Sequence, residues 1–262
     1  MIWAITRIAS DFKTWDRATR IAVISGFALL AALLIVAFAV PDLRQPALLG
    51  AGGLLIVSEL AVMWGNRGMI APLTLAQRHY VAGDFDAALR VLEGMRAKGK
   101  IDMRAATLLG NTYRQLSRLA ESEAILSEAI HKAPDHYFPR YGFGRTLLAK
   151  GDYAGALDSI RRAIEQGAPA VVHLDLAEVY FRLGMFAEAR AELESHQSSE
   201  PYRQLMRAYL LHTIDGNLPP PSPELMESGL PYWVASAERY RETPYGVALI
   251  RDIDDMQGAA SK

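Results

Sequence analysis

The side chains that most often do chemistry in proteins are present in this sequence, but they are scattered. The six histidines have no metal-ligand spacing; they are His79, His131, His136, His173, His196 and His212. His131 and His136 are five residues apart, a spacing that is far more often incidental than metal-binding. Asp252, Asp254 and Asp255 lie near the end of the chain and are most simply a solvated acidic run.

The sequence also lacks the motifs of common catalytic sites. It has no phosphate-binding glycine loop, no HExxH, no CxxC and no nucleophile elbow. The chain has 262 residues and no cysteine, which excludes disulfides, thiol catalysis and cysteine-ligated metals. Its net charge of −1 argues against a nucleic-acid binder, which usually shows a basic surplus. We therefore predict that the protein is not an enzyme, and that it holds no cofactor or metal and binds no nucleic acid.

A helical hairpin pattern recurs four times between residues 75 and 193. Equivalent positions of the four copies are spaced by 34, 34 and 33 residues; they are Leu75, Leu109, Phe143 and Leu176. Turn sequences mark three of the copies: Gly83-Asp84-Phe85, Gly151-Asp152-Tyr153 and Gly184-Met185-Phe186. The glycine in each turn can take the left-handed conformation that ends a helix. Such a period predicts a solenoid of stacked helix pairs, in which no single pair is stable alone.

The repeated pattern resembles the tetratricopeptide repeat family. The best match is Leu109-Gly110…Tyr113…Leu126…Ala129…Pro134, and the resemblance covers about residues 70 to 200. The first copy departs from the pattern at Met95 and Lys100, and the fourth at His196, so we interpret them as terminal, capping-like repeats. The expected fold is all-α: about four helical hairpins over residues 66–217, with a capping helix at Tyr202 to Thr213. The resemblance implies that the protein binds other proteins.

The N-terminal region is predicted to lie in a membrane. Ile21 to Val40 is an uncharged run of 20 residues with twelve Leu, Ile, Val or Phe, long enough to cross a ~30 Å hydrocarbon layer. A weaker run, Ala47 to Trp64, contains Glu59, and we expect two transmembrane helices within residues 21–65. Residues 1–20 carry apolar and basic positions at helical spacing, which indicates an amphipathic helix in the headgroup region.

Orientation follows from the positions of arginine and lysine. Four basic residues precede the first run and two follow the second, whereas the connection between the runs holds only Arg44. The positive-inside rule places both termini and the solenoid in the cytoplasm. Because arginine greatly outnumbers lysine, we expect a bacterial protein of the inner membrane. Glu59 is either part of an ion relay or subunit contact, or it meets Arg20 or Ser25 across the hairpin; the second interpretation is simpler.

Tetratricopeptide-like stacks commonly bind peptides in a concave groove formed by the first helix of each repeat. The residues that the repeat frame places there are Gln77, Tyr80, Asn111, Arg114, Tyr141, Arg145, Glu178 and Phe181. Asn111 and Arg145 hold equivalent positions and are candidates for binding a peptide backbone or carboxylate. No lysine accompanies them, so the clamp of the chaperone-binding members is incomplete. Alternatively, these are only solvated polar residues on one face of a scaffold.

The last segment, residues 218–262, is a proline-rich linker followed by a tail. Leu218-Pro219-Pro220-Pro221-Ser222-Pro223 favours an extended, stiff conformation. We expect one short helix from Tyr232 to Arg241, which either docks on the solenoid or on a partner, and disorder from residue 255.

We therefore predict a membrane-anchored scaffold that recruits or assembles partner proteins at the cytoplasmic face. The alternative is a stoichiometric accessory subunit of a larger membrane complex. A third hypothesis, a membrane-bound enzyme, would need a site hidden in residues that form no recognisable pattern.

Overall fold

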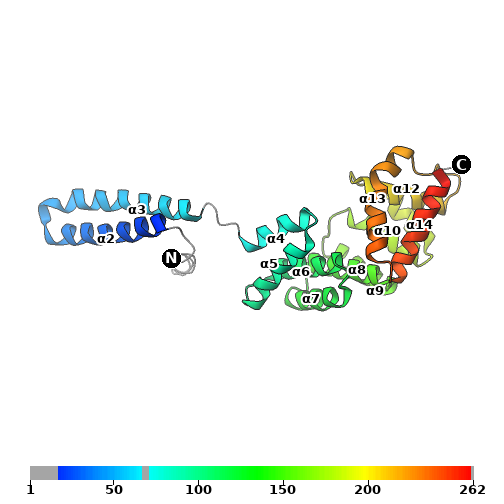
Figure 1. Ribbon diagram of the computed structural model, residues 1–262, viewed down its shortest axis with the longest axis horizontal. Helices are drawn as coiled ribbons and strands as arrows, with labels where there is room; N and C mark the ends of the chain where they lie inside the picture. The colour runs from blue at the N-terminus through cyan, green and yellow to red at the C-terminus, as the bar shows by residue number, and fades with distance from the viewer. Residues whose placement is uncertain (1–16, 67–70, 261–262) are drawn as a thin grey trace. The chain divides into compact units, whose positions relative to one another are not determined.

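The computed structural model describes residues 17–66 and 71–260, and over these residues it contains helices and no strand (Figure 1). It divides into two units at the junction of Ala71 and Pro72, and each is described by itself. The helices of the N-terminal unit are α2 (Arg17–Ala39), the short 3-10 helix η2 (Pro41–Leu43) and α3 (Arg44–Asn66). Most of the predicted amphipathic helix, residues 1–16, lies outside the described residues.

In the N-terminal unit, α2 and α3 lie side by side as a hairpin (Figure 1). Small residues line the contact: Ala37, Ala47 and Ala51 are buried, and a Cβ on Gly26 would lie 2.8 Å from the Ser58 hydroxyl. The large apolar side chains point outward instead; the exposed ones include Ile24, Phe27, Ile35, Phe38, Leu49, Ile56, Val57 and Leu60. This is the reverse of the usual arrangement in a water-soluble hairpin, where large apolar side chains lie inside.

Of the residues that the structure describes, one helix is long and apolar enough to cross a bilayer, Arg20–Ala39. Helix α3, which holds Gly50, Gly52, Gly53 and Glu59, does not meet that criterion over its described part. The predicted pair of membrane spans is therefore not supported, and one apolar helix near the N-terminus, of the kind that serves as an anchor or a signal, is what the structure has.

Glu59 does not make the contact that we expected across the hairpin. Its side chain is exposed on α3, and no hydrogen bond or ion pair to it is formed by the described residues. Arg20 keeps a buried Nε without a partner. Glu59 therefore lies on the outer surface of the hairpin, among the exposed apolar side chains.

The second unit is a series of antiparallel helix pairs. Its helices are α4 (Pro72–Val81), α5 (Phe85–Ala97), α6 (Met103–Gln115), α7 (Leu119–Lys132), α8 (Tyr137–Lys150), α9 (Tyr153–Glu165), α10 (Val172–Arg182), α11 (Phe186–Ser195), α12 (Pro201–Ile214), α13 (Pro223–Arg239) and α14 (Pro244–Ala260). Each predicted pair is present, α4 with α5, α6 with α7, α8 with α9 and α10 with α11. The all-α repeat architecture that we predicted is confirmed.

The turns inside the pairs have the predicted geometry. Gly83, Gly151 and Gly184 have φ values of +78°, +84° and +75°, in the left-handed region that glycine enters without steric cost. The second copy lacks this glycine, and Ser117 takes the same conformation at φ +59°. Because a side chain disfavours this region, Ser117 needs support from its surroundings.

The apolar core forms two clusters along the stack. One joins α4 to α7 around Leu92, Leu109 and Leu126, and the other joins α8 to α14 around Ile160 and Leu205; Phe143 packs against both. Close approach inside a pair depends on glycine, since a Cβ on Gly144 would lie 2.6 Å from Ile160 Cγ1.

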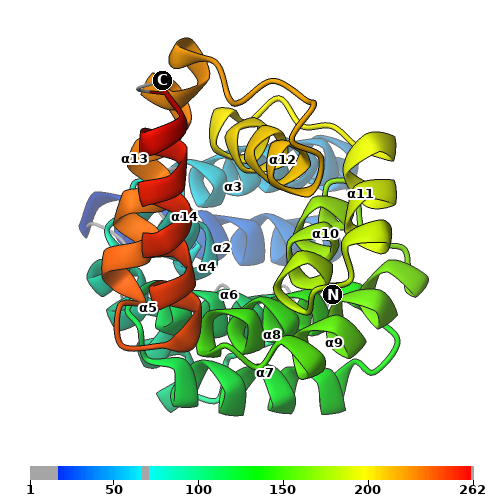
Figure 2. The same ribbon diagram turned by 90° about the vertical axis from the view of Figure 1, so that its right-hand side faces the viewer.

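The C-terminal segment is more ordered than we predicted. Helix α12 does not close the stack, because α13 packs on it and α14 packs on α13 (Figure 2). The expected short helix is in fact two helices, and α14 continues through Ala260. The sequence pattern concealed α13 because Gly229 and Pro231 lie inside it, and both residues normally interrupt a helix.

Candidate functional site

The inner face of the stack, formed by α4, α6, α8 and α10, has two halves. We call the part on α4 and α6 the open half; its predicted site residues are Gln77, Tyr80, Asn111 and, at the border, Arg114. We call the part on α8 and α10 the closed half; its predicted site residues are Tyr141, Arg145, Glu178 and Phe181. The halves differ in their cover: α14 packs on α8, whereas α13 and the turn after it reach the first half only at its border, where Tyr240 and Arg239 contact Arg114 and Ser117.

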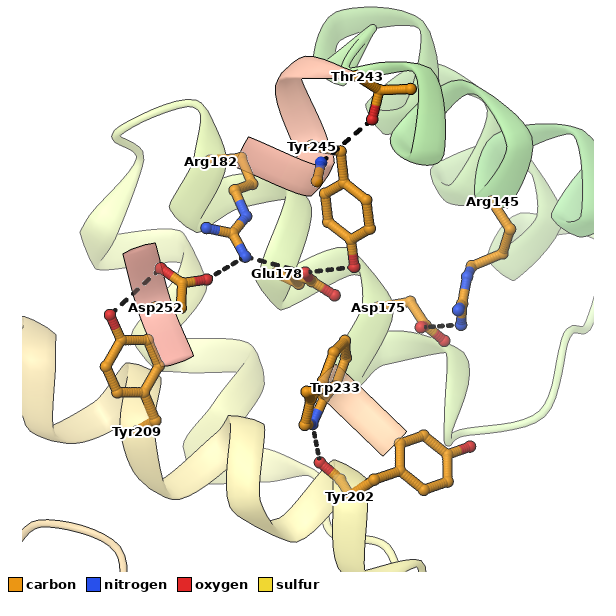
Figure 3. Close-up of polar contacts among 11 residues, drawn as sticks. Arg145, Asp175, Glu178, Arg182, Tyr202, Tyr209, Trp233, Thr243, Tyr245 and Asp252 are labelled. Carbon is orange, nitrogen blue, oxygen red and sulfur yellow. Dashed lines mark hydrogen bonds and ion pairs between the residues drawn. The ribbon is translucent and has the colours of Figure 1, made fainter. Parts of the chain in front are cut away.

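Asp175 on α10 is the centre of a buried ion-pair cluster in the closed half (Figure 3). Its carboxylate pairs with Arg145, accepts a hydrogen bond from Arg203 Nη1 at 2.9 Å, and accepts another from the Tyr141 hydroxyl at 2.6 Å. The side chain of Asp175 is only 5 % exposed. Burial acts to raise the pKa of this carboxyl group, but Arg145 and Arg203 outweigh it and hold the pKa below its usual value.

A second cluster surrounds Glu178 and connects α10 to α14 (Figure 3). Glu178 Oε1 accepts hydrogen bonds from the Tyr245 hydroxyl at 2.8 Å and from Arg182 Nη2 at 3.2 Å. Arg182 also pairs with Asp252, which accepts a hydrogen bond from the Tyr209 hydroxyl at 3.2 Å. Burial raises the pKa of Glu178 by more than its two nearby arginines lower it. Every charge here therefore has a partner inside the protein.

Helix α13 and the turn after it complete the cover. Trp233 Nε1 donates to the carbonyl oxygen of Tyr202 at 2.7 Å, and the Tyr240 hydroxyl donates to the carbonyl oxygen of Arg114 at 3.3 Å. Ser117 Oγ donates to the carbonyl oxygen of Arg239 at 2.9 Å, which ties the strained turn of the second repeat to the end of α13.

Little space remains beneath this cover. The cavity between the tail and the inner face measures about 10 Å³, and its lining includes Arg114, Arg145, Trp233, Tyr240 and Tyr245. That is about the room that one water molecule needs. A peptide therefore has no space in the closed half while α13 and α14 are docked.

The open half keeps its polar side chains available. Gln77 is exposed, and Tyr80 and Asn111 are partly exposed. At the border, Arg114 is 8 % exposed, yet no hydrogen bond or ion pair to its guanidinium is formed by the described residues, and its Nε is buried. Gln115, next to it, donates to the Tyr80 hydroxyl at 3.4 Å and has a buried Oε1 without a donor.

The predicted groove residues therefore do not form one continuous surface. Asn111 and Arg145 hold equivalent positions, but Arg145 is already paired with Asp175, so only Asn111 faces open space. Phe181 packs its ring on Phe186 of α11, with centroids 5.5 Å apart, rather than standing free in the groove.

Sequence reasoning missed several residues of the site. Asp252 is 5 % exposed and paired with Arg182, so its interpretation as part of a solvated acidic run was wrong. Tyr245 and Arg203 lie in segments without a repeat pattern, and no local signal places them at the inner face. A second missed group is His173, Glu192 and His196, whose ligand atoms all lie within 4.8 Å of one another. The Glu192-to-His196 spacing of four on one helix was its only sequence signal.

Comparison with known proteins agrees with this architecture. Residues 73–137 and residues 147–208 each match a family model described as tetratricopeptide repeat. No match was found among curated proteins.

Among solved structures, a thermophilic tetratricopeptide repeat protein of Thermus thermophilus is 20 % identical with a TM-score of 0.51, covering 71 % of this chain and 97 % of that one. MamA is 18 % identical with a TM-score of 0.46, covering 64 % of this chain and 95 % of that one.

At 20 % identity the Thermus structure shows a likeness of fold alone. Tetratricopeptide repeat proteins are generally non-enzymatic scaffolds for interactions between proteins, and the repeats of this chain imply protein partners in the same way. The repeat spacing, the helix pairs and the two matched stretches lead to one conclusion: this chain contains tetratricopeptide repeats over residues 73–137 and 147–208.

Proposed function

We propose that the protein is a membrane-anchored scaffold that holds a segment of a partner protein in the open half of its inner face. The observation that carries this proposal is the contrast between the two halves. The closed half is filled by the chain's own helices, whereas Gln77, Tyr80 and Asn111 keep exposed polar groups on equivalent helices. If the chain's own helices covered the whole inner face, no polar group there would be accessible to a partner protein.

The chemistry at the border favours a partner segment that carries a carboxylate. Arg114 is nearly buried without a carboxylate partner among the described residues, although a buried charge is normally paired. A guanidinium binds a carboxylate through two parallel hydrogen bonds, and the adjacent Gln115 and Tyr80 supply further polar groups. Arg114 also lines the filled cavity under Tyr240, so a partner can contact it only from the uncovered side, next to Tyr80 and Gln115; we expect an acidic side chain or a free C-terminus there.

The anchor is proposed to be the α2–α3 hairpin, inserted with α2 across the bilayer. Its support is the outward-facing apolar surface of both helices and their small-residue contact. A second span by α3, with the repeats and both termini in the cytoplasm of a bacterial inner membrane, remains the finer prediction. The basic residues flanking the hairpin favour that orientation.

Site-directed crosslinking tests the location of the partner. Since the natural chain has no cysteine, single cysteines can be introduced without background. Gln77→Cys lies in the open half, and Arg161→Cys, exposed on α9, is the matched control. We expect a partner adduct with the first variant only, and Arg114→Gln in the Gln77→Cys chain to reduce it. Adducts of equal yield at both positions would contradict the proposal.

Cysteine labelling in intact cells and in inverted membrane vesicles tests the anchor. Asp42→Cys lies between α2 and α3, and Lys98→Cys is exposed at the end of α5. Two spans require the two cysteines to be labelled from opposite sides of the membrane. If both are labelled from the same side, α3 does not cross.

An accessory subunit is the alternative to a scaffold with exchangeable partners. Extraction of the full chain in mild detergent separates them, because a subunit comes out in a complex of fixed stoichiometry. Partners present in less than equimolar amounts, and displaced by competitor, support the scaffold.

A further inference from the structure

Two histidines and one glutamate lie close together in the fourth repeat, where the start of α10 meets the end of α11, and none of the three is among the predicted groove residues. His173 lies in the first turn of α10, Glu192 in the last turns of α11, and His196 directly after α11. His173 Nδ1 lies 2.8 Å from Glu192 Oε2, and His196 Nδ1 lies 3.4 Å from the same oxygen. The two imidazole rings are stacked, with centroids 4.0 Å apart and planes at 10°.

We propose that His173, Glu192 and His196 form a binding site for one Zn²⁺ ion. Two imidazole nitrogens and one carboxylate oxygen are a donor set that zinc uses in proteins, with the fourth position left to water or another ligand. Ligand atoms about 2.0–2.1 Å from a tetrahedral ion lie roughly 3.3 Å apart. The separations of 2.8 and 3.4 Å between nitrogen and oxygen are close to that value. The two stacked rings lie in nearly parallel planes, so at least one imidazole must rotate for both histidines to direct a nitrogen lone pair at the same ion.

The surroundings fix the chain at one end of this cluster. Arg207 Nε donates to the carbonyl oxygens of Leu193 at 2.6 Å and of His196 at 3.2 Å, which fixes the backbone at the end of α11. Glu192 and His196 are four residues apart and therefore project from the same side of the helix end. The backbone that carries Glu192 and His196 is therefore fixed, which limits the freedom that these two ligands lose on binding.

Exposure and donor type decide which ion fits. The three side chains are 23–24 % exposed, so an ion can enter and its fourth position faces solvent. Imidazole nitrogen suits Zn²⁺ and neighbouring transition metals, whereas Mg²⁺ and Ca²⁺ require oxygen ligands. A bound ion would link α10 to α11, and thereby stabilise the last matched repeat, next to α12.

Metal content of the full-length protein, purified in detergent without a histidine tag, tests the site. After exposure to Zn²⁺ and gel filtration, we expect one Zn²⁺ per chain. His173→Ala and His196→Ala should each weaken binding by more than about tenfold, because loss of a direct ligand costs at least as much as loss of an outer partner. His131→Ala removes an exposed histidine of α7 and is the matched control, expected to retain the ion.

Thermal unfolding supplies a second readout that does not depend on how well each variant folds alone. Zn²⁺ should raise the melting temperature of the natural chain and of His131→Ala, but not that of either site variant, and Mg²⁺ should raise none. Glu192→Gln has a side chain of the same size but without the negative charge, so this variant should bind Zn²⁺ more weakly than the natural chain. Less than one Zn²⁺ per chain, or equal binding by the His173→Ala and His131→Ala variants, would overturn the proposal.

Discussion

The open and closed halves of the inner face are built from the same repeat, yet their polar side chains have different surroundings. In both halves the repeat frame places polar side chains at equivalent positions on the first helix of each pair. On α8 and α10 these side chains are buried or partly buried and already have partners: Tyr141 and Arg145 bind Asp175, and Glu178 binds Tyr245 and Arg182. On α4 and α6, Gln77 is exposed and Tyr80 and Asn111 are partly exposed. A repeat pattern therefore specifies which residues share a face, and a distant segment specifies which of them remain free.

The largest effect that we expect comes from breaking the ion-pair cluster of the closed half. Asp175→Asn leaves Arg145 and Arg203 buried without their shared carboxylate, so the free energy of unfolding should fall by about 3–5 kcal/mol. Asp158→Asn is the control, since Asp158 forms an exposed pair with Arg162 at 3.0 Å and its loss should cost under about 0.5 kcal/mol. Urea denaturation followed by circular dichroism measures both. Similar losses in the two variants would mean that the cover does not bury Asp175.

A methyl group at the start of α14 should detach the cover. A Cβ on Gly246 would collide with the backbone carbonyl of Tyr240, which cannot move aside as a side chain can. We expect Gly246→Ala to lower the free energy of unfolding toward the upper end of the roughly 1–3 kcal/mol range for overpacking, and to make α14 sensitive to protease. Gly258→Ala, in the same helix with nothing within 4 Å of the added Cβ, should be neutral or slightly stabilising. An α14 that stays protected in Gly246→Ala contradicts this view.

A pair of tyrosine variants compares the two halves directly. Tyr245→Phe removes the buried hydroxyl that donates to Glu178, and should cost roughly 1–2 kcal/mol. Tyr80→Phe removes a hydroxyl that only accepts a 3.4 Å hydrogen bond at a partly exposed position, and should change stability by less than about 0.5 kcal/mol. If denaturant unfolding shows equal losses of unfolding free energy in the two variants, the open half is also covered.

The smallest expected effect is the dependence of stability on pH, because two pKa shifts within the closed half change the free energy of unfolding in opposite directions. The lowered pKa of Asp175 contributes stability above its unfolded value of about 3.9, which is lost as pH falls through the lower folded value. The raised pKa of Glu178 acts in the opposite sense: its contribution is complete below about pH 4.3 and is lost as pH rises through the higher folded value.

Glu178→Gln should therefore remove the decline in stability above about pH 4.3 and leave the loss at lower pH. Urea midpoints measured from acidic to neutral pH test this expectation. If Glu178→Gln has the same pH profile as the natural chain, the carboxyl group of Glu178 does not titrate as described.

The sequence by itself determined the helix pairs, their order and the turns between them. Helix caps, turn glycines and a period of 34 or 33 residues are local signals, and each can be recognised within one repeat. The sequence also identified the apolar α2. It did not indicate two well-formed helices after residue 223, because Gly229 and Pro231 interrupt the pattern there.

Only the tertiary structure decided which inner-face residues are free. The Tyr240 hydroxyl forms a hydrogen bond with the carbonyl oxygen of Arg114, which lies 126 positions earlier in the chain. Arg182 pairs with Asp252, which lies 70 positions later. Such contacts depend on how a whole stack curves and on what packs against it, and no local pattern encodes them. The proximity of His173 to Glu192 and His196 also depends on tertiary structure. The antiparallel packing of α10 and α11 places these residues side by side, although they are 19 or more positions apart in the chain.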